Sequence, residues 1–327
     1  MITEISEKVL DGKYLNFKEL EFFMQGVRNG SINSLQFVSF LAAMETRNRI
    51  KGLDIDECAN FLRALRLPRS EKISGLLCNA GTGGDKIKTI NVGTTSSLVI
   101  ASAGINVLKI GYRGVTSKCG SRDLLMAWGI DPFQSIDCSI SSVKDIGIGY
   151  YDFSKLVVNE DRSGFKSPLH FLGPLSHPLE LEYKVLGCVN MGHLKFCESV
   201  LEKTCENYIL SYNPDLDEIS TITDTFISEK RNKVKKEYWL KVTDLDLKKA
   251  NYTDLEHPES KEEGARLVSE VLAGVRSSKS DLVALNAGAA IYLANKSESI
   301  QEGMEIAKQL LYSGKAQEKL DQWRKHQ

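Results

Sequence analysis

The order of segments between residues 74 and 110 constrains the fold more than any other feature of this sequence. A short apolar segment, 74–78, runs into a loop with three glycines in four positions, at 81–84. Polar residues at 91–97 lead into the apolar run 98–101, which indicates a buried helix, and an apolar strand follows at 106–110. Strand, loop, helix and strand in this order are typical of α/β proteins with parallel strands.

The first 66 residues have a different pattern, with apolar residues at helical spacing. Asn33 precedes Gln36 by three positions, which is the spacing of a helix capping box, and a further helix is expected to begin near Asp54. This pattern predicts a small all-helical module. Downstream, strands are expected at 155–158, 185–189, 207–211 and 221–228, and C-terminal helices at 262–272, 281–294 and 299–311.

The composition excludes several classes of protein. Hydrophobic residues make up 42% and charged residues 26% of 327 positions, and the net charge of −1 gives no overall field towards nucleic acid or an anionic membrane. Seven cysteines at irregular spacing favour a reducing compartment over a disulfide framework or a zinc cluster. We find neither a signal-peptide pattern nor an apolar run of about 18–20 residues. We therefore expect a cytoplasmic protein.

Two neighbouring segments have the composition of anion-binding sites. The loop 81–85 leaves its backbone free to approach a ligand and to aim successive N–H groups at an anion. Asn91 and Thr94 lie at the expected helix N-terminus, where free N–H groups favour phosphate. The loop matches neither GxGxxG nor the P-loop, so a tight turn followed by an ordinary helix cap is the alternative.

Lys109 is expected to end its strand, where α/β proteins bind their ligands. Positive charge continues at Arg113, and small residues that offer room and hydrogen bonds follow at Ser117, Cys119 and Gly120. This set favours a substrate with several phosphates, although a structural role for Arg113 is equally open. A second basic segment, at 229–237, is interpreted as a solvated hairpin loop, with a patch for a phosphate backbone as the alternative.

Asp217 and Glu218 form an acidic pair that follows an apolar strand and a turn at 213–214. Adjacent carboxylates in a strand-end loop can hold Mg²⁺ directly or through water. A solvated turn is the alternative for such a pair. The metal interpretation depends on a phosphate site nearby that needs the cation.

Six motifs in this order resemble anthranilate phosphoribosyltransferases. They are GTGGD at 81–85, NVGTT at 91–95, KIGYRGVTSKCGSRDLL at 109–125, FLGPL at 171–175, LDEIS at 216–220 and LNAGAAIYLA at 285–294. The resemblance implies a helical domain at 1–70, joined by part of 155–185, and an α/β domain with a mainly parallel sheet at 71–327. It also implies an active site in the hinge cleft and a homodimer through the N-terminal helices. If these helices pair across a dyad, apolar residues such as Phe37, Phe40, Leu41 and Met44 are expected in the interface. The alternative is that the helices pack on their own core.

The implied reaction transfers the phosphoribosyl group of phosphoribosyl pyrophosphate to anthranilate and releases pyrophosphate, with Mg²⁺ as cofactor. It belongs to tryptophan biosynthesis if the acceptor is anthranilate. Such a displacement needs no protein nucleophile, because preorganised charges can stabilise the leaving group. By resemblance, Asp217 and Glu218 bind the metal. The loop that contacts the diphosphate and the ribose in the family is matched by Gly81, Thr82, Gly83, Gly84 and Asp85. Further phosphate contacts of the family are matched by Asn91, Thr94 and Lys109.

Several positions depart from the family pattern, mostly on the acceptor side. Ile110 and Tyr112 stand where the family has histidine and asparagine near the anthranilate, and Glu160 falls where it has an arginine for the acceptor carboxylate. Arg162 or Lys166 could replace that arginine by a shifted register. On the donor side, Gly93 and Cys119 replace family serines.

These departures leave three hypotheses open. The first is a transferase that uses anthranilate or another nitrogenous aromatic acceptor. The second is a non-catalytic member that binds a nucleotide or nucleic acid, which Gly93 and the basic segment 229–237 favour. The third is an enzyme like the nucleoside phosphorylases of the thymidine phosphorylase type, which resemble this chain less around Asp85 and the acidic pair.

Overall fold

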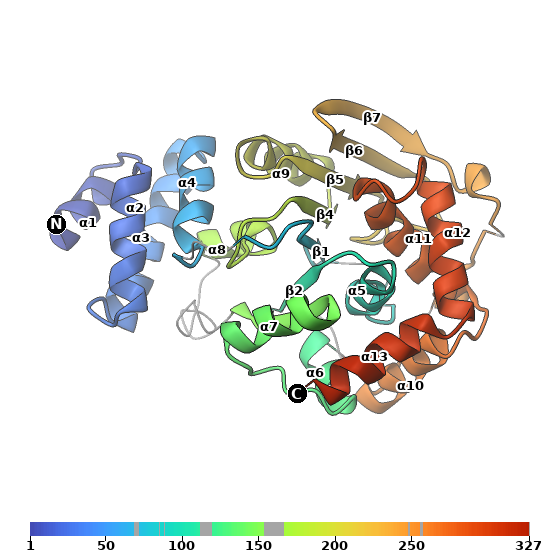
Figure 1. Cartoon of the computed structure of the whole chain (residues 1–327). Coiled ribbons are helices and arrows are strands. Elements are labelled where there is room, and N and C mark those ends of the chain that lie inside the picture. Colours follow the sequence, from blue (N-terminus) through green and yellow to red (C-terminus); the bar gives the residue numbers. More distant parts are fainter. Residues whose placement is uncertain are drawn as a thin grey trace. The chain divides into compact units, whose positions relative to one another are not determined.

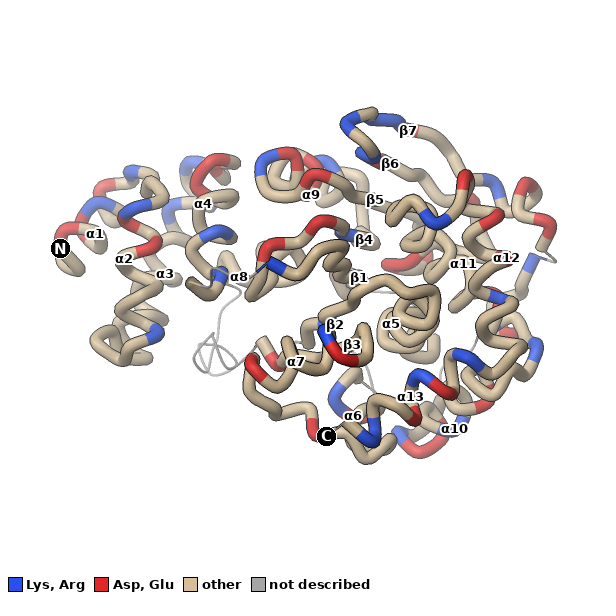
Figure 2. The backbone as a smooth tube through the Cα atoms, viewed as in Figure 1, with Lys and Arg blue, Asp and Glu red and all other residues tan. Residues whose placement is uncertain are grey.

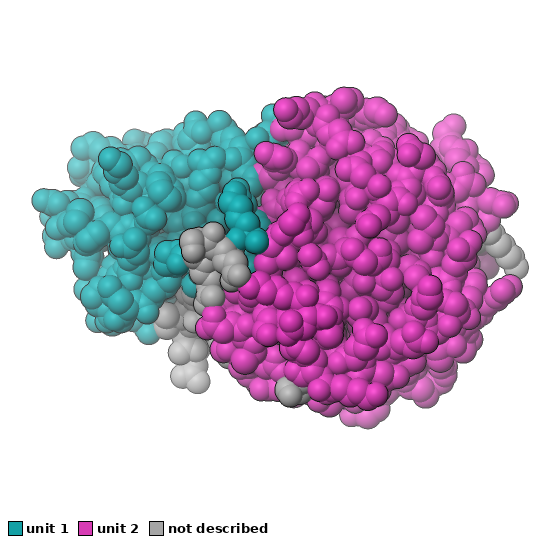
Figure 3. Space-filling view, viewed as in Figure 1, with its two compact units in different colours: residues 1–72, 153–180, 196–204 teal, residues 73–152, 181–195, 205–327 magenta. Residues whose placement is uncertain are grey.

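The computed structural model describes residues 1–68, 72–84, 86–87, 89–111, 120–153, 167–247, 249–255 and 258–326 (Figure 1). The chain divides into two compact units (Figure 3). Unit 1 comprises residues 1–72, 153–180 and 196–204, and unit 2 comprises 73–152, 181–195 and 205–327. None of the helices in these described ranges is long and apolar enough to cross a membrane.

Unit 1 is helical, and local sequence signals set where its helices begin. Asn33 and Gln36 form the predicted reciprocal capping box, and the Asp54 side chain accepts a hydrogen bond from the Glu57 backbone N–H. The N-cap predictions are therefore confirmed. The helices are α1 (Ile2–Leu10), α2 (Phe17–Arg28), α3 (Ser34–Lys51), α4 (Ile55–Leu65), α8 (Pro168–Leu172) and η3 (Gly173–Leu175), with residues 196–204 of α9 (Met191–Thr204).

The apolar stripe of α3 is covered within unit 1 itself. Phe37, Phe40, Leu41 and Met44 are each at most 3% exposed, and the rings of Phe23 and Phe40 stack with centroids 4.0 Å apart. The suggestion that these four side chains form a dimer surface is therefore wrong. Helical periodicity shows that a face is buried, but not whether its partner is the same chain or another.

Unit 2 contains a seven-stranded sheet with the order β3-β2-β1-β4-β5-β6-β7. The five strands from β3 to β5 pair in parallel, and β6 and β7 continue the sheet antiparallel. The prediction of a mainly parallel sheet beside a helical domain is therefore confirmed. The strands are β1 (Leu77–Gly81), β2 (Val107–Gly111), β3 (Ile148–Asp152), β4 (Tyr183–Cys188), β5 (Asn207–Tyr212), β6 (Thr225–Arg231) and β7 (Val234–Leu240).

Strand ends differ from the prediction in ways that matter for the site. The segment expected at 74–78 lies at Leu77–Gly81, because Ala80 and Gly81 pair with Leu186 and Gly187 of β4. Lys109 is consequently the third residue of β2 and does not end it. The strand expected at 221–228 is Thr225–Arg231, and the one expected at 155–158 lies outside the described residues.

The basic segment 229–237 is mostly strand. β6 and β7 pair up to Arg231 and Val234, so only Asn232 and Lys233 form the turn, both with positive φ. Lysines mark the tip of this hairpin (Figure 2). The interpretation as a solvated hairpin is correct in exposure, because residues 232–237 are all exposed, but most of the segment is strand and only two residues form the loop. Lysines on an edge strand such as β7 discourage pairing with other chains.

Helix α11 is the centre of the packing in unit 2, with buried residues along nearly its whole length. It packs against α5 and α12, and Gly288 and Gly303 allow the close approach to α12, since a Cβ at either would overlap the other helix's backbone. The helices are α5 (Val92–Ser102), α6 (Ser121–Ala127), α7 (Ile136–Ile146), η4 (Val242–Leu245), η5 (Tyr252–Leu255), α10 (Lys261–Leu272), α11 (Ser278–Leu293), α12 (Ile300–Tyr312) and α13 (Lys315–Lys325).

Candidate functional site

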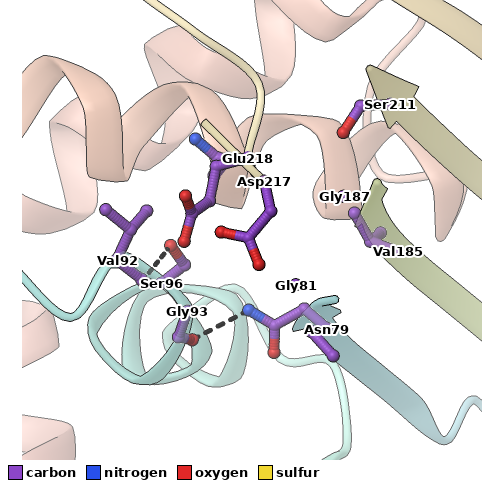
Figure 4. Close-up of a pocket in the computed structure, with 12 residues that line it drawn as sticks. Asn79, Gly81, Val92, Gly93, Ser96, Val185, Gly187, Ser211, Asp217 and Glu218 are labelled. Carbon is purple, nitrogen blue, oxygen red and sulfur yellow. Dashed lines mark hydrogen bonds between the residues drawn. The ribbon is translucent and has the colours of Figure 1, made fainter. Parts of the chain in front are cut away.

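The acidic pair lies against the carboxyl ends of β1 and β4 (Figure 4). A Cβ at Gly187 would overlap the backbone carbonyl of Asp217, and a Cβ at Gly81 would overlap its carboxylate. Only glycine allows such an approach at both strand ends. Asp217 is consequently 6% exposed, although it lies in a loop.

Hydrogen bonds join the glycine-rich loop to the acidic loop and to β4. The backbone N–H of Gly83 donates to Asp217 Oδ2 at 2.5 Å, and that of Thr82 donates to the Gly187 carbonyl at 2.9 Å. Gly83 and Gly84 have φ values of 75° and 100°, which glycine adopts readily. The two sequence motifs, 134 residues apart at this contact, therefore form one structure.

Two asparagines hold the acidic loop from either side. Asn213 donates to the Glu218 carbonyl at 2.6 Å. From α11, Asn286 accepts from the Ile219 N–H and donates to the Ile219 carbonyl, both at 2.9 Å, and it also donates to the Leu282 carbonyl at 2.9 Å. Asn286 is 8% exposed. Asn213 also accepts a hydrogen bond from the Leu216 N–H at 2.9 Å, so the backbone is held on both sides of the acidic pair.

The N-terminus of α5 faces the same region. Asn91 is its N-cap and accepts a hydrogen bond from the Thr94 N–H at 3.0 Å. The Thr94 hydroxyl donates to Ser121 Oγ at 2.8 Å, which connects α5 to the start of α6. Gly120, the N-cap of α6, donates its N–H to Asp123 Oδ2 at 2.9 Å.

Lys109 is buried and points under the first turn of α5. Its Nζ donates to the Asn79 carbonyl at 2.6 Å, and Asn79 Nδ2 donates in turn to the Gly93 carbonyl at 2.8 Å. A Cβ at Gly93 would lie 3.1 Å from Lys109 Nζ. The absence of a side chain at Gly93 thus leaves space for this ammonium group.

Burial is the largest influence on the titration of Lys109 and lowers its pKa, because a charged ammonium loses hydration there. The Cys78 side chain raises this pKa, and Lys184 lowers it further. The carboxylates of Glu218 and Asp217 also raise it, since they favour the charged form. Lys109 is therefore electrostatically coupled to the acidic pair.

A small cavity of about 20 Å³ lies between the end of β1, the first turns of α5 and the acidic pair (Figure 4). Asp217 and Glu218 both line it, together with Gly93 and Asn286. The described residues contain no group of three or more His, Cys, Asp or Glu side chains placed to hold a metal. Two carboxylates with room beside them suit Mg²⁺, which is usually bound by one or two carboxylates and completed by phosphate oxygens and water.

The structure thus places the glycine-rich loop, the N-terminus of α5 and the acidic pair, which the sequence analysis predicted as a donor site, near the carboxyl ends of β1 and β4. Asn79, Gly187, Asn213 and Asn286 were missed by the sequence analysis; only Asn286 had a signal, as a polar residue within an apolar helix. The residues singled out by the sequence analysis that lie outside the described ranges are Asp85, Tyr112, Arg113, Ser117, Cys119, Glu160, Arg162 and Lys166.

Two family models match this chain, both of a glycosyl transferase family. Residues 3–67 match its helical bundle domain and residues 75–317 its a/b domain. The anthranilate phosphoribosyltransferase of Persephonella marina is 31% identical, over 100% of this chain and 99% of the relative. That of Acetivibrio thermocellus is 32% identical, over 99% and 96%.

Solved structures of anthranilate phosphoribosyltransferases are also similar to this chain. The anthranilate phosphoribosyltransferase of Thermus thermophilus has a TM-score of 0.82 and 27% identity, covering 98% of each chain. The enzyme from Saccharomyces cerevisiae, solved in complex with PRPP and Mg, has a TM-score of 0.77 and covers 99% of this chain and 97% of its own. At 20% identity this similarity supports the fold alone. Fold and sequence define a two-domain glycosyl transferase. The chain belongs to the anthranilate phosphoribosyltransferase family, which confirms the predicted enzyme class.

Proposed function

We propose that this chain is a Mg²⁺-dependent phosphoribosyltransferase that uses phosphoribosyl pyrophosphate as donor and anthranilate as acceptor, and so serves tryptophan biosynthesis. The main support for the proposal is the hydrogen bond between Gly83 and Asp217, because it joins a loop suited to bind phosphate to a carboxylate suited to bind a metal ion. Relatives at 31–32% identity named for anthranilate support this acceptor. The acceptor residues suggested by the sequence lie outside the described ranges.

Each part of the site has a role in this reaction. Asp217 and Glu218 would hold Mg²⁺, which neutralises the diphosphate as the bond to ribose C1 breaks. The amides of the glycine-rich loop and the N-terminus of α5 would bind and orient the phosphates. Lys109 would place its ammonium where negative charge grows on the leaving group.

Calorimetric titration with phosphoribosyl pyrophosphate tests the donor half of the proposal. We expect binding that depends on Mg²⁺ and is lost in an Asp217→Ala/Glu218→Ala double variant. Equal binding by the double variant would place the donor elsewhere. No binding by the wild-type chain in the presence of Mg²⁺ would contradict the proposed function.

A further inference from the structure

The backbone N–H of Gly83 already has an anionic partner in the structure. It belongs to the glycine-rich loop that a diphosphate would contact under the proposed function. In the structure it donates to Asp217 Oδ2 at 2.5 Å, so the carboxylate occupies the position of an anion in the loop. Hydrogen bonds to a charged acceptor are about twice as strong as neutral ones.

A phosphate oxygen cannot join this contact without displacing the carboxylate. Asp217 is 6% exposed, with its carboxylate against Gly81 and its backbone carbonyl against Gly187. Two anions at one amide would also repel each other strongly in a site largely shielded from water. Diphosphate alone therefore meets a competitor that is already in place.

The backbone around the pair limits how the carboxylate can leave. Asn286 fixes the backbone of Ile219 by two hydrogen bonds, and Asn213 fixes the carbonyl of Glu218. Displacement of Asp217 from Gly83 is thus a rotation of its side chain and needs no movement of the loop. A rotated carboxylate requires a new positive partner, and a divalent cation carried by the diphosphate supplies one.

We propose that Asp217 exchanges between the Gly83 amide and the divalent cation, so that the diphosphate gains the amide only when a cation takes the carboxylate. This inference rests on the proposed function and adds a regulation of the same site. It makes Asp217 an inhibitor of cation-free diphosphate binding as well as a metal ligand.

Titration with inorganic pyrophosphate, with EDTA or with Mg²⁺, tests the exchange. In EDTA we expect Asp217→Ala to bind pyrophosphate at least about tenfold more tightly than wild type, because the Gly83 amide is released. Glu218→Ala is the matched control, since it removes the same charge nearby and leaves the contact intact. Removal of the Glu218 charge also relieves repulsion of the pyrophosphate, so we expect a gain in EDTA for this control that is several-fold smaller than that of Asp217→Ala. Mg²⁺ should strengthen binding only in the wild type.

A gain for Asp217→Ala in EDTA that exceeds the gain for Glu218→Ala supports the exchange. Equal gains, or no gain, would overturn it while wild-type binding in Mg²⁺ still supports the proposed function. Absence of pyrophosphate binding in all three proteins under both conditions would overturn both. Asp217→Asn keeps an oxygen that can accept from Gly83, and tighter EDTA binding by this variant than by Asp217→Ala would also contradict the exchange.

Discussion

Lys109 and Gly93 form a complementary pair: the ammonium of Lys109 occupies the space beside Gly93, where a Cβ would lie 3.1 Å from Nζ. The same ammonium donates to the Asn79 carbonyl at 2.6 Å. The residue that departs from the family pattern therefore has a structural reason in this chain. Gly93 permits a buried lysine directly under the N-terminus of α5.

Gly93→Ala tests this relationship. The added methyl must displace the ammonium, so we expect kcat to fall by about tenfold, on the scale of one weakened electrostatic contact. Stability should change by less than about 1 kcal/mol, because the lysine end is flexible and alanine favours the helix. In a Lys109→Met background Gly93→Ala should have no further effect on kcat, and additive losses would contradict the coupling.

The pH dependence of kcat/KM tests the charge on Lys109. Burial lowers the pKa of Lys109, so the ammonium loses its proton as pH rises, at a pH below its ordinary 10.5. We expect kcat/KM for phosphoribosyl pyrophosphate to decrease as pH rises through this pKa. Lys109→Arg should move the decrease to higher pH, since arginine stays protonated. An unchanged profile in that variant would assign the titration to another group.

The same pKa shift affects stability. Below pH 10.5 but above the lowered pKa, the unfolded chain binds the proton that folded Lys109 has lost. Stability at this site therefore rises with pH in that window. We expect Lys109→Met to reduce the pH slope of the free energy of unfolding there, as measured by urea denaturation at a series of pH values. A slope as steep as that of wild type would show that Lys109 does not contribute.

Asn286→Ala should disturb the acidic pair without touching it. The substitution removes three hydrogen bonds and leaves the buried backbone groups of Ile219 unpaired, at a cost of about 2–4 kcal/mol. We expect the Mg²⁺ concentration for half-maximal activity to rise with a smaller change in kcat at saturating Mg²⁺. The Asn286→Asp variant keeps an oxygen that can accept from the Ile219 N–H, but it loses the amide group that donates to the carbonyls of Ile219 and Leu282. A variant that loses stability but keeps wild-type Mg²⁺ dependence would limit Asn286 to a structural role.

The homodimer remains a prediction, and the structure suggests different residues for it. In unit 1, Leu10, Leu35 and Ile50 are 73–76% exposed, whereas Phe37 is fully buried. If the helical unit mediates dimerisation, Leu35→Asp should yield a folded monomer by sedimentation velocity and circular dichroism. Lys18→Asp, on exposed α2 surface, is a charged control. A dimer unaffected by Leu35→Asp would place the interface away from Leu35.

Local signals in the sequence were sufficient for some features of the fold and insufficient for others. Asn33 was identified as a helix cap, and a helix start was placed near Asp54, because capping depends on residues three positions apart. The strand Val234–Leu240 was missed because an exposed edge strand rich in lysine lacks an apolar pattern. The strand Ile148–Asp152 was missed too, although all five of its residues are buried.

In the candidate site, too, some features could be predicted from local sequence and others could not. Glycine-rich and acidic motifs could be recognised in the sequence, but not the contact between Gly83 and Asp217, which depends on tertiary packing. The role of Gly187 was equally hidden, since it follows from the path of a loop 30 residues further on. Lys109 was predicted to lie at the end of its strand, whereas Ile110 and Gly111 continue β2 beyond it by pairing with Tyr151 and Asp152 of β3.

Turnover is the most direct test of the proposed function. Phosphoribosyl pyrophosphate, anthranilate and Mg²⁺ are incubated with the full chain, and the phosphoribosylated amine and pyrophosphate are quantified by mass spectrometry and a coupled pyrophosphate assay. We expect both products in equal amounts, with neither formed in EDTA or by the Asp217→Ala/Glu218→Ala variant. Pyrophosphate binding without turnover of anthranilate or of other aromatic amines would contradict the proposed transferase.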